Sequence, residues 1–222
     1  MKDIGIKRDT ETLIFTVREA PGGSDFIVLD ETFSQNAYGL QPYDFRDDGI
    51  FIDIGANIGA VSVLAHRTGA KKIICYEPVP ENYNLLVRNL AANGVEAELH
   101  QEGVWGDHRT IRIASFQGGS NSYPDFLARY QGEIIEAKTV TLPDILDRFE
   151  SVAVLKCDTE GAEYEFMMDV ALNKKIRKLV LEFHPNTQEM HGKLISTLME
   201  THNFRGFGSR FSGGLYLGER YE

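Results

Sequence analysis

Apolar and polar residues alternate in blocks along most of this chain. From residue 50 onward, short apolar runs are followed by longer segments in which apolar residues recur every three or four positions. Short apolar runs bounded by turn residues predict buried strands, and the three-to-four spacing predicts amphipathic helices. Strands are expected at 50–54, 72–76, 96–101, 152–157 and 178–183, and helices at 58–68, 80–92, 162–172 and 187–202. Such strand–helix units predict an α/β fold with a parallel sheet and helices on both faces.

Several helix boundaries have local signals of their own. Gly69 follows the first helical segment, and Asn93-Gly94 follows the second, which begins with Pro80. Proline suits the first turn of a helix, where its missing N–H has no partner to lose, and glycine suits the residue after the last turn. The sequence Thr141-Leu142-Pro143-Asp144 has the residues of a capped helix start.

The first 49 residues differ from this alternating pattern. A strand is expected at 12–17, a turn at Pro21-Gly22-Gly23 and a second strand at 26–29. We therefore expect residues 1–49 to form a strand-and-loop extension packed on one globular unit, residues 50–222.

The alternation is also interrupted in the middle and at the end of the chain. Residues 110–114 and 137–140 are expected as extra strands around a loop rich in glycine, serine and asparagine at 118–122. The tail, residues 204–211 and 214–218, predicts a terminal hairpin that adds an antiparallel edge to the sheet.

Length, composition and charge set limits on function. The 222 residues are 42% hydrophobic and 25% charged, which is ordinary for one globular domain. The net charge of −10 argues against generic binding to nucleic acid or anionic membranes. No apolar run predicts a secretory leader or membrane insertion, so a cytoplasmic location is expected. Cys75 and Cys157 both lie in predicted core strands, which favours buried free thiols in a reducing compartment.

The most informative pattern is a glycine turn followed by a carboxylate. Residues 51–59 read Phe-Ile-Asp-Ile-Gly-Ala-Asn-Ile-Gly, and the next apolar run ends in Tyr76-Glu77-Pro78. Glycines at such a turn let the backbone approach a nucleoside-bearing cofactor, and the carboxylate accepts hydrogen bonds from its ribose hydroxyls. The spacing has no third glycine for a dinucleotide, and Asn57 stands where the helix starts. The pattern therefore favours S-adenosylmethionine over NAD.

Polar residues end five of the predicted apolar strands. They are Asp53, Glu77, Gln101-Glu102, Asp158 and Glu182. Ligands in open parallel sheets lie beyond the carboxyl ends of the strands. Any one of these residues is explained by a helix cap or a loop, but together they predict a polar rim over one edge of the sheet.

Five motifs, in this order and spacing, give the chain a resemblance to a known family. They are residues 53–59, residues 76–83, residues 141–146, the block Leu155-Lys156-Cys157-Asp158-Thr159-Glu160-Gly161-Ala162-Glu163, and Leu181-Glu182-Phe183. Together they resemble the FkbM family of S-adenosylmethionine-dependent methyltransferases, over about residues 26–205. The resemblance implies a Rossmann-like class I methyltransferase fold with a mostly parallel seven-stranded sheet of order 3-2-1-4-5-7-6. It also implies O-methylation of hydroxyls on small molecules such as macrolides, or on sugars and glycans.

The resemblance further implies a role for individual residues. Gly55 and its neighbours would face the methionine part of the cofactor, Glu77 would hold the ribose, and Asp158 would lie near the methionine amine and the transferred methyl. The implied cofactor-binding residues are Asp53, Gly55, Ala56, Asn57, Gly59, Glu77, Glu102, Gly103, Val104 and Asp158, with Glu102 to Val104 bordering the adenine.

A hydroxyl acceptor needs a base, and three residues are candidates. Asp158, Glu160 and His184 are all expected near the methyl group. Each of two candidates has an alternative role. His184 is also explained as a structural or solvent-exposed residue at a strand end, and Glu160 as a favourable partner of the helix dipole. Asp158 and Glu182 end adjacent strands and have the chemistry to share a divalent metal, but we expect no metal.

Other interpretations stay open at this point. Trp105 is a candidate for stacking on adenine or for packing, Lys156 for neutralising carboxylates, and Tyr38 for closing over the cofactor or anchoring the extension. The alternatives in function are a methyltransferase for a nitrogen or macromolecular acceptor, and a binding module without turnover. The N-P-P-Y signature of amino-group methylation is replaced by Cys-Asp-Thr-Glu at 157–160. Acceptor choice is expected to lie in the N-terminal segment and in residues 115–136.

Overall fold

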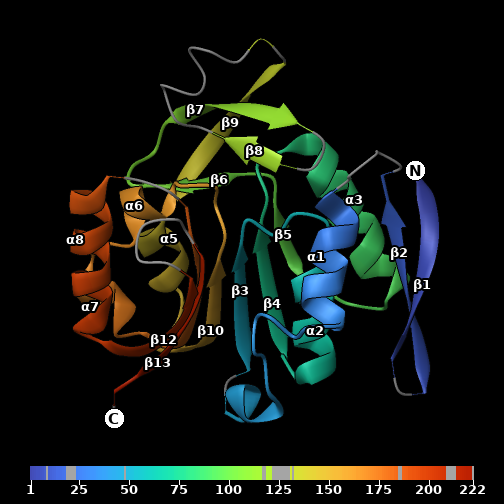
Figure 1. The fold of residues 1–222 in the computed structure, drawn as a ribbon, viewed down its shortest axis with the longest axis horizontal. Helices are drawn as coiled ribbons and strands as arrows, with labels where there is room; N and C mark the ends of the chain where they lie inside the picture. Colours follow the sequence, from blue (N-terminus) through green and yellow to red (C-terminus); the bar gives the residue numbers. More distant parts are fainter. Residues whose placement is uncertain are drawn as a thin grey trace.

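Seven strands form the central sheet of the molecule (Figure 1). The computed structural model describes residues 1–8, 10–18, 24–47, 49–116, 119–121, 131, 133–184, 187–208 and 214–221. The strands are β3 (Ile50–Ile54), β4 (Lys72–Tyr76), β5 (Glu98–His100), β10 (Val152–Cys157), β11 (Ile176–Phe183), β12 (His202–Gly208) and β13 (Gly214–Arg220). Their order is β12-β13-β11-β10-β3-β4-β5. This confirms the expected order 3-2-1-4-5-7-6.

The sheet is mostly parallel, with an antiparallel edge. Strands β11, β10, β3, β4 and β5 run parallel, whereas β13 pairs antiparallel with both β11 and β12. Because β3 separates β4 from β10, Cys75 and Cys157 are not neighbours. Both thiols are buried and free, as expected.

Helices cover both faces of this sheet (Figure 1). On one face pack α2 (Ala60–Thr68) and α3 (Pro80–Ala92). On the other pack α5 (Leu142–Leu146), α6 (Glu163–Phe166), α7 (Val170–Asn173) and α8 (Gln188–Met199). Successive side chains of β3 point to opposite faces of the sheet, and this separates two cores. Phe51 packs in one hydrophobic cluster and Ile52 in the other. Among the described residues, no helix has both the length and the apolar character to cross a membrane.

Three of the predicted helix boundaries are confirmed. Gly69 ends α2 with a φ of +120°, and its N–H donates to the carbonyl oxygen of Ala65. Pro80 is the first residue of α3. Thr141 and Asp144 form the capping box of α5.

Two expected helices have different bounds. The segment 162–172 forms two short helices, α6 and α7, because the Asp169 side chain accepts hydrogen bonds from the N–H groups of Ala171 and Leu172 and starts a new helix. The segment 187–202 is helical only to Met199, since β12 begins at His202.

A second, four-stranded sheet lies at the carboxyl-end edge of the central sheet (Figure 1). Its strands, in the order β6-β9-β7-β8, are β6 (Gly103–Trp105), β9 (Ile134–Thr141), β7 (Thr110–Phe116) and β8 (Gly119–Asn121). The prediction of a loop at 118–122 was wrong for residues 119–121, which pair with the end of β7. Residues 118 and 122 lie outside the described residues.

The N-terminal extension is a hairpin followed by a helix. Strands β1 (Lys2–Arg8) and β2 (Glu11–Val17) pair antiparallel, and α1 (Ser24–Phe33) and the short 3-10 helix η1 (Pro42–Phe45) follow. The expected strand at 26–29 was wrong, because Asp25, Leu29 and Thr32 are buried at helical spacing. The expected turn at 21–23 and the residues 209–211 of the tail lie outside the described residues.

Amide side chains hold this hairpin on α3. The Asn89 side chain accepts from the Thr16 N–H at 2.7 Å and donates to its carbonyl at 3.2 Å. The Asn93 side chain accepts from the Ile14 N–H at 3.0 Å and donates to the Ile14 carbonyl at 2.7 Å. The backbone of β2 is thereby satisfied on an edge that would otherwise be unpaired.

Candidate active site

A pocket opens at the carboxyl ends of β3, β4 and β10, beside the second sheet. It encloses about 650 Å³ of empty space, including its open mouth. The lining residues come from five segments of the chain and include Gly55, Asn57, Glu77, Asn82, Glu102, Gly103, Val104, Ile111, Ile113, Asp158, Thr159, Glu160 and Ala162. The pocket therefore lies where ligands bind in open parallel sheets.

The glycine turn after β3 is shaped by its contact with β10. Gly55 has a φ of +78°, and its N–H donates to the carbonyl of Tyr76 at 2.9 Å. A Cβ at position 55 would lie 1.8 Å from the carbonyl oxygen of Asp158. At Gly59, with a φ of +84°, a Cβ would lie 2.8 Å from the Leu86 side chain. Packing against the Asp158 backbone thus requires a glycine at position 55, while at position 59 the left-handed backbone favours glycine.

A buried ion pair supports this turn from behind. Asp53 is fully buried, and its carboxylate accepts from the Ser62 hydroxyl at 2.6 Å and lies 3.3 Å from Lys156 Nζ. Lys156 also donates to the Gly55 carbonyl at 2.6 Å. Burial by itself lowers the pKa of Lys156, but the charges of Asp53 and Asp158 outweigh it and hold that pKa above its usual value. Lys156 therefore stays charged and neutralises the carboxylates around the turn.

Glu77 joins the glycine turn to the end of β4. Its side chain is 4% exposed, and Asn57 N–H donates to Oε2 at 2.8 Å. Oε1 accepts from Val79 N–H at 2.9 Å and from the Asn82 amide at 3.3 Å. Burial raises the pKa of Glu77, and these three hydrogen bonds oppose the rise. The result is a desolvated carboxylate held in one orientation at the pocket wall.

Another part of the pocket lining is largely apolar. Glu102, Gly103 and Val104 line this part, and Ile111 and Ile113 of β7 complete it. The two isoleucines were missed by the sequence analysis because β7 lies in a sheet whose position local patterns do not predict. Trp105 instead packs against the core on the α5–α8 face of the central sheet. This favours its packing interpretation.

The turn after β10 is held by a carboxylate that the sequence analysis missed. Glu163 is fully buried and accepts from Thr159 Oγ1 at 3.0 Å, Gly161 N–H at 2.9 Å and His184 N–H at 2.9 Å. The only signal for it is its place as the last residue of the K-x-D-x-E-G-x-E block. It connects the turn at residues 158–161 to the end of β11.

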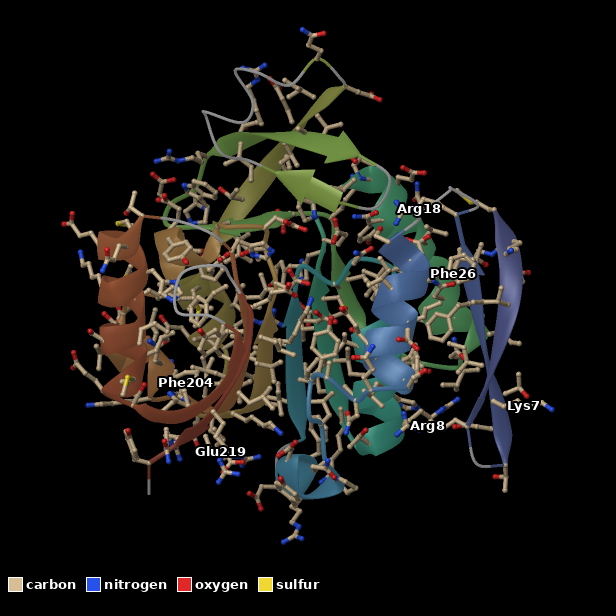
Figure 2. The ribbon with its side chains drawn as sticks, viewed as in Figure 1. Lys7, Arg8, Arg18, Phe26, Phe204 and Glu219 are labelled. Carbon is tan, nitrogen blue, oxygen red and sulfur yellow. The ribbon has the colours of Figure 1, made fainter. Side chains whose placement is uncertain are left out.

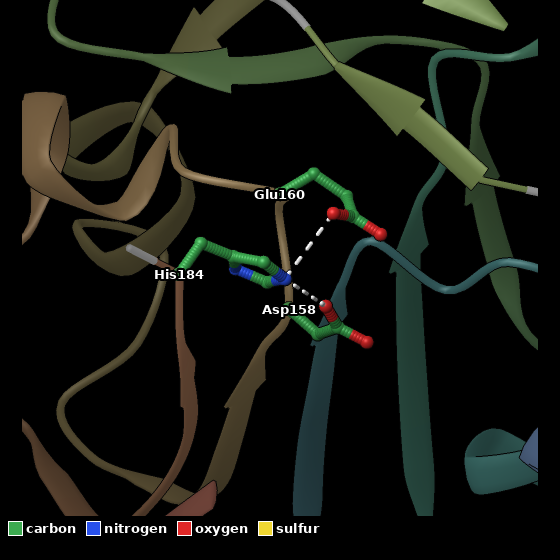
Figure 3. A group of neighbouring side chains, drawn as sticks. All are labelled: Asp158, Glu160 and His184. Atoms are coloured by element: carbon green, nitrogen blue, oxygen red, sulfur yellow. Dashed lines mark ion pairs between the residues drawn. The ribbon is translucent and has the colours of Figure 1, made fainter. Parts of the chain in front are cut away.

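Asp158, Glu160 and His184 converge beside the pocket (Figure 3). His184 Nε2 lies 3.3 Å from Glu160 Oε2 and 3.9 Å from Asp158 Oδ1, while Nδ1 lies 3.4 Å from Glu163 Oε1. Burial lowers the pKa of His184, but these three carboxylates outweigh it and raise that pKa to about 9. His184 is therefore an imidazolium at neutral pH, set among three carboxylates.

Further acidic groups surround Asp158. The charge of Asp158, followed by burial, raises the pKa of Glu182 to about 7. Burial raises the pKa of Glu31 on α1, and the charge of Asp158 adds to that rise.

Tyr38 is 3% exposed and packs in the core, which favours its anchoring interpretation.

The predicted residues thus fall into two groups. Lining the pocket are Gly55, Asn57, Glu77, Glu102, Gly103, Val104, Asp158 and Glu160. Outside that lining are Asp53, Ala56, Gly59 and His184. The second group supports the first through the turn after β3 and the turn after β10.

The strand order and the position of the pocket define a class I methyltransferase fold. An rRNA methylase from Streptococcus thermophilus has a similar fold, with a TM-score of 0.52 at 9% sequence identity, covering 84% of this chain and 95% of that one. The model of the methyltransferase FkbM domain matches residues 53–208, more than half of the chain. The protein therefore belongs to the FkbM family of methyltransferases, as the sequence motifs predicted.

Relatives with assigned names share about a quarter of their residues with this chain. The 31-O-demethyl-FK506 methyltransferase FkbM of Streptomyces tacrolimicus is 24% identical over 226 residues, covering 85% of each chain. The AMB antimetabolite synthetase AmbE of Pseudomonas aeruginosa is 24% identical over 222 residues, covering 80% of this chain. This chain spans about 10% of the length of AmbE.

Proposed function

We propose that this protein transfers a methyl group from S-adenosylmethionine to a hydroxyl oxygen of a small molecule, a sugar or a glycan. The observation that supports this most directly is the buried Glu77 carboxylate, hydrogen-bonded to the glycine turn at Asn57 and facing the pocket. Membership of a methyltransferase family supports the reaction class.

The residues of the pocket suit the parts of S-adenosylmethionine. Glu77 has the carboxylate that a ribose diol needs as an acceptor, and charge-assisted hydrogen bonds of this kind contribute about 1.5–3 kcal/mol each. The apolar wall of Val104, Ile111 and Ile113 suits a flat adenine ring. Asp158, which also lines the pocket, suits an ammonium or a sulfonium.

The reaction also requires that the acceptor hydroxyl lose its proton. S-adenosylmethionine supplies a methyl group already activated by its sulfonium. The protein therefore has to align the acceptor oxygen with the methyl group and the sulfur, and to remove the hydroxyl proton. The Glu160 carboxylate lines the pocket and is the base we assign. Burial raises the pKa of Glu160, and the charge of His184, 3.3 Å away, opposes that rise and orients the carboxylate. Asp158 serves the cofactor side of the same space.

The choice of oxygen over nitrogen has three supports. The relative from Streptomyces tacrolimicus is named for an O-demethyl acceptor. In this chain, Cys157-Asp158-Thr159-Glu160 stands where amino-group methyltransferases carry N-P-P-Y. The acidic surroundings of Asp158 supply carboxylates that suit proton removal from a hydroxyl.

Calorimetry with S-adenosylhomocysteine, S-adenosylmethionine and NAD tests the cofactor assignment. We expect micromolar or tighter binding of the first two and no measurable binding of NAD, with Glu77→Ala weakening binding about tenfold or more. Glu98→Gln is the control, since Glu98 pairs with Arg148 outside the pocket. A screen of hydroxyl and amine acceptors that detects S-adenosylhomocysteine release then tests the acceptor. Equal binding of NAD would contradict the cofactor, and release with amines alone would contradict the oxygen acceptor.

A further inference from the structure

We propose that Arg18 of the N-terminal extension is a positioning residue for the cofactor, acting through Asn82 on Glu77. The inference rests on the proposed binding of S-adenosylmethionine at Glu77. It makes the N-terminal extension part of the cofactor site, although Arg18 itself does not line the pocket.

Arg18 is held rigidly by a buried partner. It follows β2 (Figure 2) and is 8% exposed, and Asp25 on α1 is 1% exposed. The Asp25 carboxylate accepts from Arg18 Nη2 at 2.5 Å and from Nε at 3.1 and 3.2 Å, as well as from the Arg18 backbone N–H at 2.7 Å. This fork fixes the plane of the guanidinium and leaves Nη1 pointing toward α3.

Asn82 connects this guanidinium to the site carboxylate. Arg18 Nη1 donates to Asn82 Oδ1 at 2.7 Å, and Asn82 Nδ2 donates to Glu77 Oε1 at 3.3 Å. A guanidinium only donates and a carboxylate only accepts, so the amide between them has one favourable orientation, with its oxygen toward Arg18 and its nitrogen toward Glu77. Asn82 is 3% exposed, and water is therefore a poor substitute for either partner.

The consequence for Glu77 is both geometric and electrostatic. Without Arg18, the Asn82 amide is free to rotate and to turn its oxygen toward Oε1, which replaces an attraction by a repulsion. Glu77 would keep the backbone donors of Asn57 and Val79 but lose the side-chain donor that sets its rotation. The hydrogen bond from Asn82 also opposes the effect of burial on the Glu77 pKa. Its loss should weaken ribose binding and raise that pKa further.

A mutant cycle measured by calorimetry with S-adenosylhomocysteine tests this coupling. Arg18 and Asp25 are replaced together, as Arg18→Met with Asp25→Leu, because either alone leaves an unpaired buried charge. We expect this pair variant and Asn82→Ala each to weaken binding about five- to tenfold. The variant combining all three substitutions should bind no more weakly than Asn82→Ala alone, since Arg18 acts through Asn82.

Two further measurements separate positioning from general damage. In Asn82→Ala the low-pH loss of binding should begin at a higher pH than in the wild type, whereas a purely structural defect would weaken binding equally at every pH. Arg88→Met removes an exposed ion pair with Asp3 between the same hairpin and the same helix, and should bind like the wild type. If the pair variant does not fold, Arg18→Lys keeps the charge beside Asp25 but loses the fork, and replaces it in the cycle.

The outcomes are distinguishable from a failure of the proposed function. Wild-type protein that does not bind S-adenosylhomocysteine defeats the proposed function. Wild-type binding that is weakened by Glu77→Ala but unchanged in the pair variant defeats the positioning role of Arg18. Losses that multiply in the combined variant would also overturn it.

Discussion

Gly55 packs so closely on Asp158 that a Cβ on the glycine would lie 1.8 Å from the Asp158 carbonyl oxygen. The two residues come from turns about a hundred positions apart, and the Asp158 N–H donates to the Ile54 carbonyl at 3.0 Å in the same contact. The glycine turn and the turn that holds Asp158 and Glu160 are therefore one structural unit. Substitution at the first should disturb the second.

Gly55→Ala tests this contact. The alanine meets both the left-handed φ of +78° and the 1.8 Å approach, so we expect a loss of about 3 kcal/mol or more in the free energy of unfolding, measured with urea. Gly94→Ala is the matched control, with a φ of +65° and nothing within 4 Å of the added Cβ. It should cost about 1 kcal/mol. Equal losses in both variants would show that the contact with Asp158 is unimportant.

Glu160→Gln and His184→Ala separate turnover from cofactor binding. Each should lower turnover on the true acceptor about 10²-fold with the affinity for S-adenosylhomocysteine nearly unchanged, because the first removes the base and the second the cation that holds it. Asp158→Asn should impair both quantities. Full activity in the Glu160 and His184 variants would point instead to catalysis by alignment alone.

Glu182→Gln should change how stability depends on pH. The folded-state pKa of about 7 lies above the usual 4.5, so the wild type loses stability as the pH rises from about 4.5 through 7. The glutamine variant lacks this loss, and should be more stable than the wild type by about 2 kcal/mol at pH 8 and not at pH 4.5. Unfolding experiments at pH 8 and at pH 4.5 measure this difference in stability between the variant and the wild type. Glu150→Gln is the control, since Glu150 is exposed. A stability difference that does not vary with pH would contradict the raised pKa.

Lys156→Met should strongly destabilise the fold. It leaves Asp53 charged, fully buried and without its cationic partner, which typically costs about 3–5 kcal/mol. Adding Asp53→Asn removes that charge and should restore part of the loss in urea unfolding. Lys175→Met, at an exposed pair with Asp147, should cost less than about 1 kcal/mol. No recovery in the double variant would mean that the Lys156 bond to the Gly55 carbonyl matters more.

Local spacing was enough to predict the parallel strands, the caps at Gly69 and Thr141, and the strand-end carboxylates Glu77 and Asp158. These features depend on neighbouring residues, because period, turn chemistry and capping act over a few positions. The order of the sheet and the family followed from the motifs at 53–59 and 155–163. Where the period was too short to separate helix from strand, as at 26–29, the sequence pattern failed and burial of Asp25, Leu29 and Thr32 decided the helix.

Tertiary structure alone decided which side chains work together. Glu163 reaches His184 across 21 positions, and Arg18 reaches Asn82 across 64. Their partners are chosen by the distances and orientations left after the sheet and helices have packed, and no local pattern contains that information. The sequence therefore determined the class of chemistry at the strand ends, while the packed fold determined the charge on His184 and the orientation of Glu77, because both depend on burial and on charges brought near from distant segments.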